Sequence, residues 1–273
     1  MNIHSVLKNA TKDSVRVDPF PHLIIENALD AELYSQLEKE YPFQTMIEGN
    51  SGLSPNIRYQ VSAVDGLKID SRLSSLWREF IEYHTSNDFF GEVYDLFSKS
   101  LYELYPHISR EESTGVLYRD KKKILLDCQP GVNTPTFKQT SVKIAHLDNP
   151  TQLFAGLLYF RDDYDNSLGG DLEIYKYKNN KYKFYGHRLI KSKYIETVNS
   201  VPYKKNTLVL FINSINSLHG VTPRSATKFQ RRLVNFIGTV GTPGDFDKRL
   251  FHIPLKKKNI FVRSINFLHR KFV

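Results

Sequence analysis

Two histidines and an aspartate are the first residues whose types and spacing suit chemistry. His146 and Asp148 stand two residues apart in a predicted strand, so both side chains project from one face of it. His219 follows Asp148 by 71 residues, which leaves room for strands that bring the two ends together. Imidazole and carboxylate groups together suit a borderline divalent metal such as iron. A turn-capping aspartate beside a buried histidine explains the His-x-Asp triplet equally well, so both interpretations stay open here.

A pair of arginines is the second such feature. Arg231 and Arg232 begin a predicted strand twelve and thirteen residues after His219. Because neighbouring side chains alternate along a strand, only one of the two can point inward. A buried guanidinium needs an anion, and a carboxylate bound through two hydrogen bonds is its best match. Taken singly, each arginine also fits a surface position.

The elements that must position these residues fall into two regions. Up to about residue 110 the pattern is mainly helical, with a short strand at 23–25 and helices near 30–41, 71–84 and 90–104. Beyond it, short β-rich runs alternate with turn residues, at 123–127, 141–146, 153–161, 171–177, 208–212 and 231–238. We therefore expect a mainly β protein with a helical N-terminal layer, built on a double-stranded β-helix (a cupin-like jelly roll). The predicted divisions are a helical region over 1–110, a jelly-roll core over 111–250 and a basic C-terminal helix or tail over 251–273.

Composition restricts the class of protein. The 273 residues are 40% hydrophobic and 25% charged, as in a globular protein. The longest apolar run, at 153–160, is too short to span a membrane, so no membrane span is expected. The net charge of +9 is concentrated in lysine runs that we interpret as solvated. The single cysteine, Cys128, and an N-terminus without the apolar core of a signal peptide predict a cytoplasmic location. The oligomeric state is left open.

Several motifs together resemble one family, the non-haem Fe(II)- and 2-oxoglutarate-dependent dioxygenases, in particular their prolyl 4-hydroxylase-like branch of bacterial and viral type. The motifs that carry this resemblance are His146-Leu147-Asp148-Asn149-Pro150, Leu158-Tyr159-Phe160-Arg161, Gly169-Gly170-Asp171-Leu172-Glu173-Ile174-Tyr175, His219-Gly220-Val221-Thr222-Pro223 and the opening Asp18-Pro19-Phe20-Pro21-His22-Leu23-Ile24-Ile25. They occur in the order of the family and extend over about 120 residues of the expected barrel.

The resemblance implies a set of roles. His146, Asp148 and His219 would bind Fe(II) and serve catalysis. Arg231 or Arg232 would bind the far carboxylate of 2-oxoglutarate, and Tyr159 would donate a hydrogen bond to it. The expected reaction is hydroxylation of a prolyl, peptidyl or small-molecule substrate, with consumption of O2 and release of succinate and CO2. Ascorbate is an optional cofactor of such enzymes.

Three alternatives remain at this stage. We favour Arg231 over Arg232 because Asn235, four residues on, is the small polar residue that the family usually has in that register. An AlkB-like nucleic-acid demethylase is compatible with the basic charge, but that branch spaces its two arginines by six residues, whereas Arg224 and Arg231 are seven apart. Nucleic acid is therefore not an expected partner. A catalytically inactive, cupin-like binding module is the third alternative.

Other polar residues receive weaker predictions. Asn133 precedes the His-x-Asp segment and is a candidate for the mouth of the pocket, and residues 58–60 are candidates for a lid. We expect a hairpin loop that carries Asp162, Asp163 and Asp165. Six further histidines lack partner spacing and are expected at the surface or in satisfied core positions: His22, His84, His107, His187, His252 and His269.

Overall fold

The structure is a computed structural model that describes residues 5–43, 46, 54–140, 144–180, 182–185, 188–241 and 248–254. The helices are α1 (Ala31–Lys39), α3 (Ala63–Gly66), α4 (Ser75–Tyr83) and α5 (Asn87–Leu104), with short 3-10 turns at Lys12–Ser14, Lys178–Asn180 and Ser192–Tyr194. The strands are β1 (His22–Glu26), β2 (Arg58–Gln60), β3 (Thr114–Val116), β4 (Ile124–Asn133), β5 (Gln152–Tyr159), β6 (Leu172–Tyr177), β7 (Phe184–Tyr185), β8 (Leu189–Ile190), β9 (Ile195–Val201), β10 (Thr207–Ile212), β11 (His219–Val221) and β12 (Arg231–Val240).

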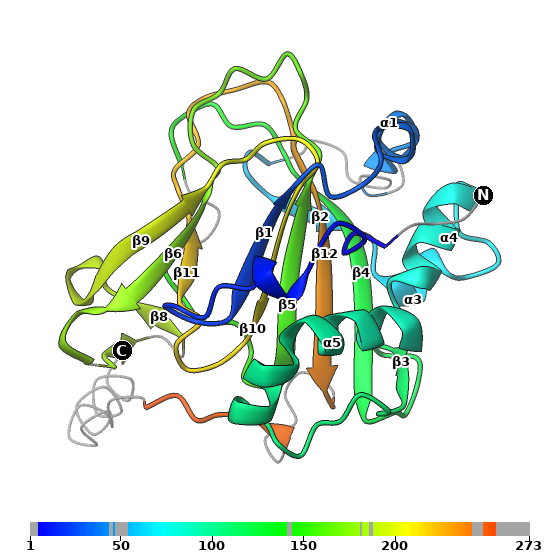
Figure 1. The fold of residues 1–273 in the computed structure, drawn as a ribbon. Coiled ribbons are helices and arrows are strands. Elements are labelled where there is room, and N and C mark those ends of the chain that lie inside the picture. The colour runs from blue at the N-terminus through cyan, green and yellow to red at the C-terminus, as the bar shows by residue number, and fades with distance from the viewer. Residues whose placement is uncertain are drawn as a thin grey trace, which may run out of the picture.

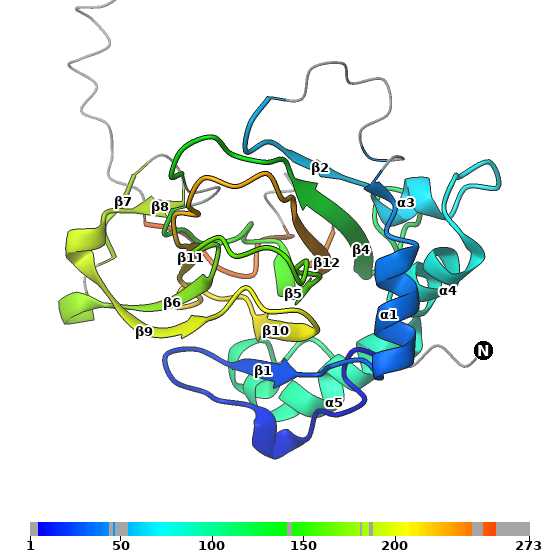
Figure 2. The same cartoon turned by 90° about the horizontal axis from the view of Figure 1, so that it is seen from above.

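Two mainly antiparallel sheets form the barrel (Figures 1 and 2). In the large sheet the strands run in the order β1-β10-β5-β12-β4-β2, and β3 joins β4 in parallel. The small sheet has the order β11-β6-β9, and β7 and β8 pair with each other beside it. The non-consecutive order of paired strands is typical of a jelly roll, so the predicted fold class is confirmed.

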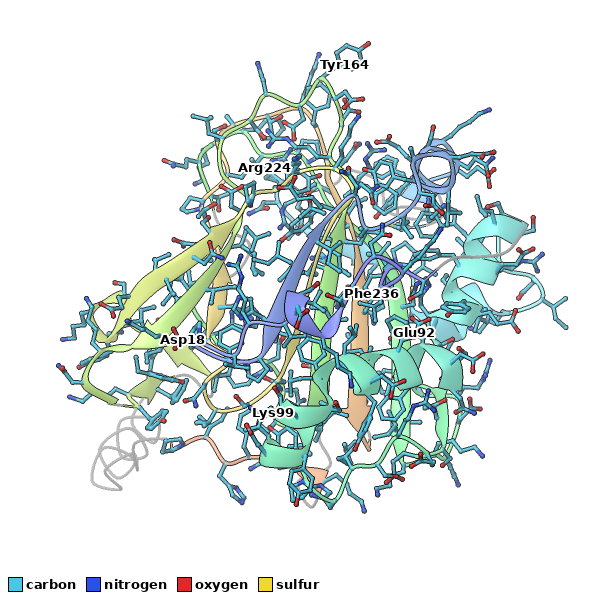
Figure 3. The ribbon with its side chains drawn as sticks, viewed as in Figure 1. Asp18, Glu92, Lys99, Tyr164, Arg224 and Phe236 are labelled. Carbon is cyan, nitrogen blue, oxygen red and sulfur yellow. The ribbon has the colours of Figure 1, made fainter. Side chains whose placement is uncertain are left out.

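The two faces of the large sheet have different neighbours. Along β12, Val234 and Phe236 belong to the main hydrophobic core with the helices, whereas Leu233 belongs to a second cluster inside the barrel. This is the two-residue period of a strand covered on both faces. On the outer face, Phe236 lies 6.3 Å from Phe80 of α4, measured between ring centroids (Figure 3). Helix packing thus seals the outer face and leaves the inner face for a site.

The N-terminal region contributes strands as well as helices. β1 pairs with β10, and β2 pairs with β4, so both outermost strands of the large sheet come from the first 60 residues. The predicted helices match α1, α4 and α5 to within a few residues, and α5 begins at the cap Ser86, whose side chain accepts a hydrogen bond from the Phe89 N–H. The predicted helical region over 1–110 is therefore only partly helical.

Most predicted strands are present. Those at 153–161, 171–177, 208–212 and 231–238 correspond to β5, β6, β10 and β12, and β4 extends further than the predicted 123–127. The strand predicted at 141–146 begins outside the described residues, and His146 forms an isolated bridge. Residues 255–273 of the predicted C-terminal helix or tail also lie outside them. Within the described part of the chain, no helix is both long and apolar enough to cross a membrane.

Candidate metal and oxo-acid site

The structure brings His146, Asp148 and His219 to one point inside the barrel. One potential ligand atom from each lies within 4.8 Å of the others. The Nε2 atoms of both histidines are 3.5 Å from the Asp148 carboxylate, which presents Oδ1 to His146 and Oδ2 to His219. All three residues are buried. Two imidazoles and one carboxylate therefore face a single centre.

A short backbone pairing creates this geometry. His146 and His219 form an antiparallel bridge in which each N–H donates to the other's carbonyl, at 2.9 and 3.1 Å. Residues paired in this way project to the same side of a sheet, and the two rings lie 4.3 Å apart between centroids. His219 opens β11, which pairs with β6 and so fixes the bridge to the small sheet.

The hydrogen bonds of the two imidazoles turn their Nε2 atoms toward the common centre. Nδ1 of His146 lies 2.7 Å from the Ile144 carbonyl, and Nδ1 of His219 lies 2.9 Å from the Ser217 carbonyl. Since a carbonyl only accepts, Nδ1 carries the proton in each neutral ring and the Nε2 lone pair faces the centre. The buried Nε2 of His146 has no hydrogen-bond partner in the described part of the chain. An unsatisfied lone pair beside a carboxylate and a second imidazole fits a divalent metal ion.

A cavity of about 460 Å³ extends from these residues between the two sheets. Its volume is in the range of pockets that hold small molecules. The side chains that line it come from both sheets and from the segments next to β5 and β8, namely Arg58, Gln60, His146, Asp148, Asn149, Gln152, Ala155, Leu157, Leu172, Arg188, Phe211, His219, Val221, Arg231 and Asn235.

Arg231 is the buried cation of this cavity. Its side chain is 2% exposed, and its Nε and Nη2 donate to the Gly170 carbonyl at 3.0 and 2.8 Å. The guanidinium carbon lies 5.1 Å from the centre of the Tyr159 ring and 5.0 Å from that of Tyr203. Burial raises the pKa of Tyr159, and its hydroxyl has no hydrogen-bond partner among the described residues. Arg231 and Tyr159 thus present a cation and a free hydroxyl side by side.

Arg232 occupies the other face of β12. Its Nε donates to the Phe160 carbonyl at 3.0 Å, and its Nη2 donates to Glu38 of α1 at 2.8 Å. Its guanidinium carbon also lies 5.5 Å from the centre of the Tyr41 ring. Arg232 does not line the cavity, and it ties the sheet to α1. The alternation expected at this pair is present, with Arg231 as the inward residue.

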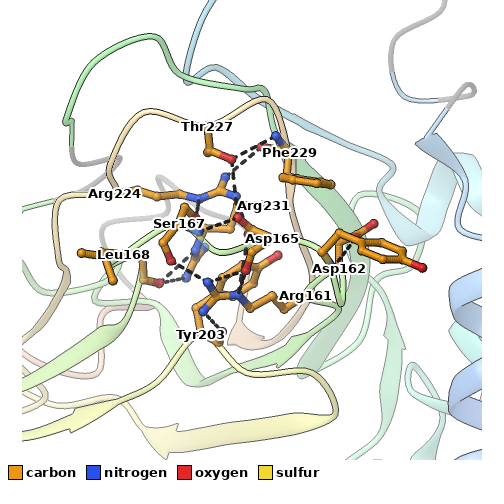
Figure 4. Close-up of polar contacts among 12 residues, drawn as sticks. Arg161, Asp162, Asp165, Ser167, Leu168, Tyr203, Arg224, Thr227, Phe229 and Arg231 are labelled. Atoms are coloured by element: carbon orange, nitrogen blue, oxygen red, sulfur yellow. Dashed lines mark hydrogen bonds and ion pairs between the residues drawn. The ribbon is translucent and has the colours of Figure 1, made fainter.

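An ion-pair network fixes the loops next to Arg231 (Figure 4). Nη2 of Arg224 donates to Asp165 at 2.7 Å, and its Nε donates to Ser167 at 3.0 Å. Arg161 donates to the backbone carbonyls of Asp165 and Ser167. Burial by itself raises the pKa of Asp165, but the Ser167 hydrogen bonds and the Arg224 charge outweigh it and hold that pKa below its usual value. Asp165 is therefore a buried structural anion.

Sequence reasoning assigned several cavity residues differently or missed them. Arg58 and Gln60 line the cavity from an edge strand, so the prediction of a lid at 58–60 was wrong. Asn133 is 1% exposed and pairs with both Arg58 and Arg231, which places it on the inner face and not at the cavity mouth. Arg188 was missed, since nothing in its sequence surroundings marks it out.

Comparison with known proteins agrees with this architecture. No family model and no curated protein matches the sequence. Among solved structures, a candidate oxygenase from Shewanella oneidensis matches with a TM-score of 0.50 and 14% identity, over 92% of this chain and 90% of that one. The chain shares the fold of that oxygenase.

Prolyl hydroxylases are also among the similar structures. One from Pseudomonas putida matches with a TM-score of 0.44 and 13% identity, over 81% of this chain and 92% of that one. One from Trichoplax adhaerens, in complex with a hypoxia-inducible-factor peptide fragment, matches with a TM-score of 0.45 and 16% identity, over 80% and 83% of the two chains. Identities this low concern the fold alone.

Proposed function

We propose that the protein is a non-haem Fe(II)- and 2-oxoglutarate-dependent dioxygenase that hydroxylates a small-molecule or peptidyl substrate. The observation that carries the proposal is the presence, in one cavity, of the His146-Asp148-His219 centre and of the buried Arg231. A metal centre and a separate carboxylate receptor together suit a chelating oxo acid with a second acidic end. The sequence motifs that resemble this family point to the same residues.

In this proposal each residue has a distinct task. His146, Asp148 and His219 hold Fe(II), which when bound supplies the activation of O2 that couples oxidative decarboxylation of 2-oxoglutarate to substrate oxidation. Arg231 binds the far carboxylate of 2-oxoglutarate, and the free Tyr159 hydroxyl donates to it. The apolar side chains of Leu157, Leu172 and Val221 exclude water from the space between. Ascorbate as an accessory reductant, and a cytoplasmic location, remain predictions.

An anaerobic titration of the metal-free protein with Fe(II) and 2-oxoglutarate tests the proposal. We expect the weak visible charge-transfer band of an Fe(II)–oxo-acid chelate in the wild type. His219→Ala should lose both the band and stoichiometric iron. Arg231→Ala should bind iron but need far more 2-oxoglutarate, and Arg232→Ala is the matched control that should keep wild-type affinity for both. A wild-type protein that binds iron and forms no band would contradict the assignment, and so would one that binds no iron.

A further inference from the structure

The cavity carries more positive charge than the proposed function uses. Three arginines line it, Arg58, Arg188 and Arg231, against the single carboxylate of Asp148. Asp148 belongs to the metal centre, and Arg231 accounts for one carboxylate of 2-oxoglutarate. Arg58 and Arg188 are left without an anion in the described part of the chain. Both residues are half-buried, and an unpaired cation that is partly withdrawn from water is suited to bind an anionic ligand.

Arg58 reaches the cavity from the edge of the large sheet. In one row across three strands, Arg58 of β2 pairs with Asn133 of β4, and Asn133 pairs with Arg231 of β12. Side chains paired in this way project from the same face, here the inner one. Neither polar atom of the Asn133 amide has a hydrogen-bond partner among the described residues, and the buried Nε of Arg58 has none either. The row therefore holds unused donors between two guanidinium groups.

The two guanidinium groups also affect each other. Burial, together with the positive charge of Arg231, lowers the pKa of Arg58 to about 10. Arg58 is still charged at neutral pH, but it lies in surroundings that favour an added negative charge. No hydrogen bond or ion pair of its side chain is present in the part of the chain that the structure describes.

Arg188 approaches the cavity from another side. It precedes β8, and its carbonyl accepts a hydrogen bond of 3.0 Å from the N–H of Leu147, between two residues of the metal centre. Seen from above the barrel, β8 and β2 lie on opposite sides of the loop that follows β4 (Figure 2). The Arg188 side chain makes no hydrogen bond or ion pair with the residues described. The two remaining cations thus border the space beside the metal centre from two directions.

We propose that the substrate is a small acidic molecule whose carboxylate or phosphate group binds Arg58 and Arg188. This inference rests on the proposed function, because it assigns Arg231 to 2-oxoglutarate. The cavity volume suits a small molecule, and guanidinium groups bind carboxylate and phosphate with the same paired geometry. The substrate's acidic group lies between Arg58 and Arg188, and its remaining atoms face the metal centre.

Isothermal titration calorimetry with inorganic phosphate tests whether Arg58 and Arg188 bind an anion. The protein is first saturated with 2-oxoglutarate and with Mn(II), as a redox-stable substitute for Fe(II), and trimethyl phosphate serves as a neutral probe of similar shape. We expect phosphate, and not trimethyl phosphate, to bind. Arg58→Gln and Arg188→Gln should each weaken phosphate binding by about tenfold and change 2-oxoglutarate affinity by less than about twofold. Arg58→Lys should retain part of the affinity. Arg119→Gln, at an exposed arginine outside the cavity, should change neither affinity.

The outcomes distinguish a failure of the acidic-substrate inference from a failure of the proposed dioxygenase function. Phosphate that binds no better than trimethyl phosphate, or that binds equally well in both glutamine variants, overturns the acidic-substrate inference. So does an Arg58→Gln variant that loses affinity for 2-oxoglutarate, because Arg58 would then serve the co-substrate. A folded wild type that binds neither Mn(II) nor 2-oxoglutarate contradicts the proposed function instead. Phosphate titration of the metal-free protein and of the same variants then still decides whether the two arginines form an anion site.

Discussion

Arg231 donates two hydrogen bonds to the backbone carbonyl of Gly170, and this contact joins the large sheet to the start of the small one. It uses Nε and Nη2 of the guanidinium and anchors the group in one orientation. Gly170 and its neighbour Gly169 both adopt positive φ angles, +81° and +77°. The backbone conformation that these two glycines adopt therefore places the Gly170 carbonyl against Arg231.

The two glycines should differ sharply in their tolerance of a methyl group. A Cβ on Gly169 would lie 2.0 Å from the Pro223 carbonyl oxygen, whereas one on Gly170 would come no closer than 3.4 Å to Arg231. Gly170→Ala should cost about 1–2 kcal/mol of unfolding free energy, through backbone strain. Gly169→Ala adds a backbone clash and should cost on the order of 3 kcal/mol or more. Urea unfolding of both variants checks this, and equal losses would be inconsistent with the geometry described.

Tyr159→Phe should separate stability from co-substrate binding. The hydroxyl of Tyr159 is buried without a partner among the described residues, so its removal should leave the unfolding free energy unchanged or raise it slightly. If that hydroxyl donates to 2-oxoglutarate, the affinity for 2-oxoglutarate should fall about fivefold, which corresponds to about 1 kcal/mol. Chemical denaturation and calorimetric titration measure the two effects. A destabilised variant with wild-type affinity would show that the hydroxyl is structural.

Asp165→Asn should be one of the most destabilising polar changes in the chain. Asp165 is buried against Arg224, and the substitution leaves the Arg224 guanidinium inside without a counter-ion. Breaking a buried pair in this way costs about 3–5 kcal/mol. Asp163→Asn is the matched control, because Asp163 pairs with Lys205 at an exposed position and should cost less than about 1 kcal/mol. Similar thermal unfolding curves for the two variants would refute the structural role of Asp165.

The sequence was sufficient to single out His146 and Asp148 as candidate metal ligands because local rules determine much of their placement. The two-residue period places His146 and Asp148 on one side, and the same rule allows only one inward arginine in the 231–232 pair. The rule that one of the two arginines points inward follows from local strand geometry. Whether that arginine is Arg231 or Arg232 depends on the long-range pairing of β12 with β4 and β5.

Residues that reach the cavity through long-range pairing could not be predicted. β2 has only three residues, too few to show a period, and it becomes a strand because β4 offers it an edge. β9 is mostly exposed and polar, so it lacks the continuous buried apolar run that marks β10. Arg58 and Arg188 are ordinary surface arginines by sequence, and only the tertiary structure brings them to the same cavity as the candidate metal ligands.

His84 should make the stability of the protein depend on pH. Its Nδ1 donates to the Phe80 carbonyl and its Nε2 accepts from the Val6 N–H, so the neutral ring is satisfied and a second proton has no acceptor. Burial lowers the pKa of His84 to about 3. Between pH 6.5 and 3 the unfolded chain binds a proton at His84 that the folded chain does not bind. The free energy of unfolding therefore falls as the pH falls through this window, by about 1.4 kcal/mol per pH unit well below 6.5.

Urea unfolding of metal-free wild type and of His84→Leu at pH 7.5 and 5.5 measures this effect. The variant should lose less unfolding free energy between the two pH values than the wild type, although it is less stable than the wild type at both. His107→Gln, at an exposed histidine, should keep the wild-type pH dependence. An acid loss as large in His84→Leu as in the wild type would assign the effect to other groups.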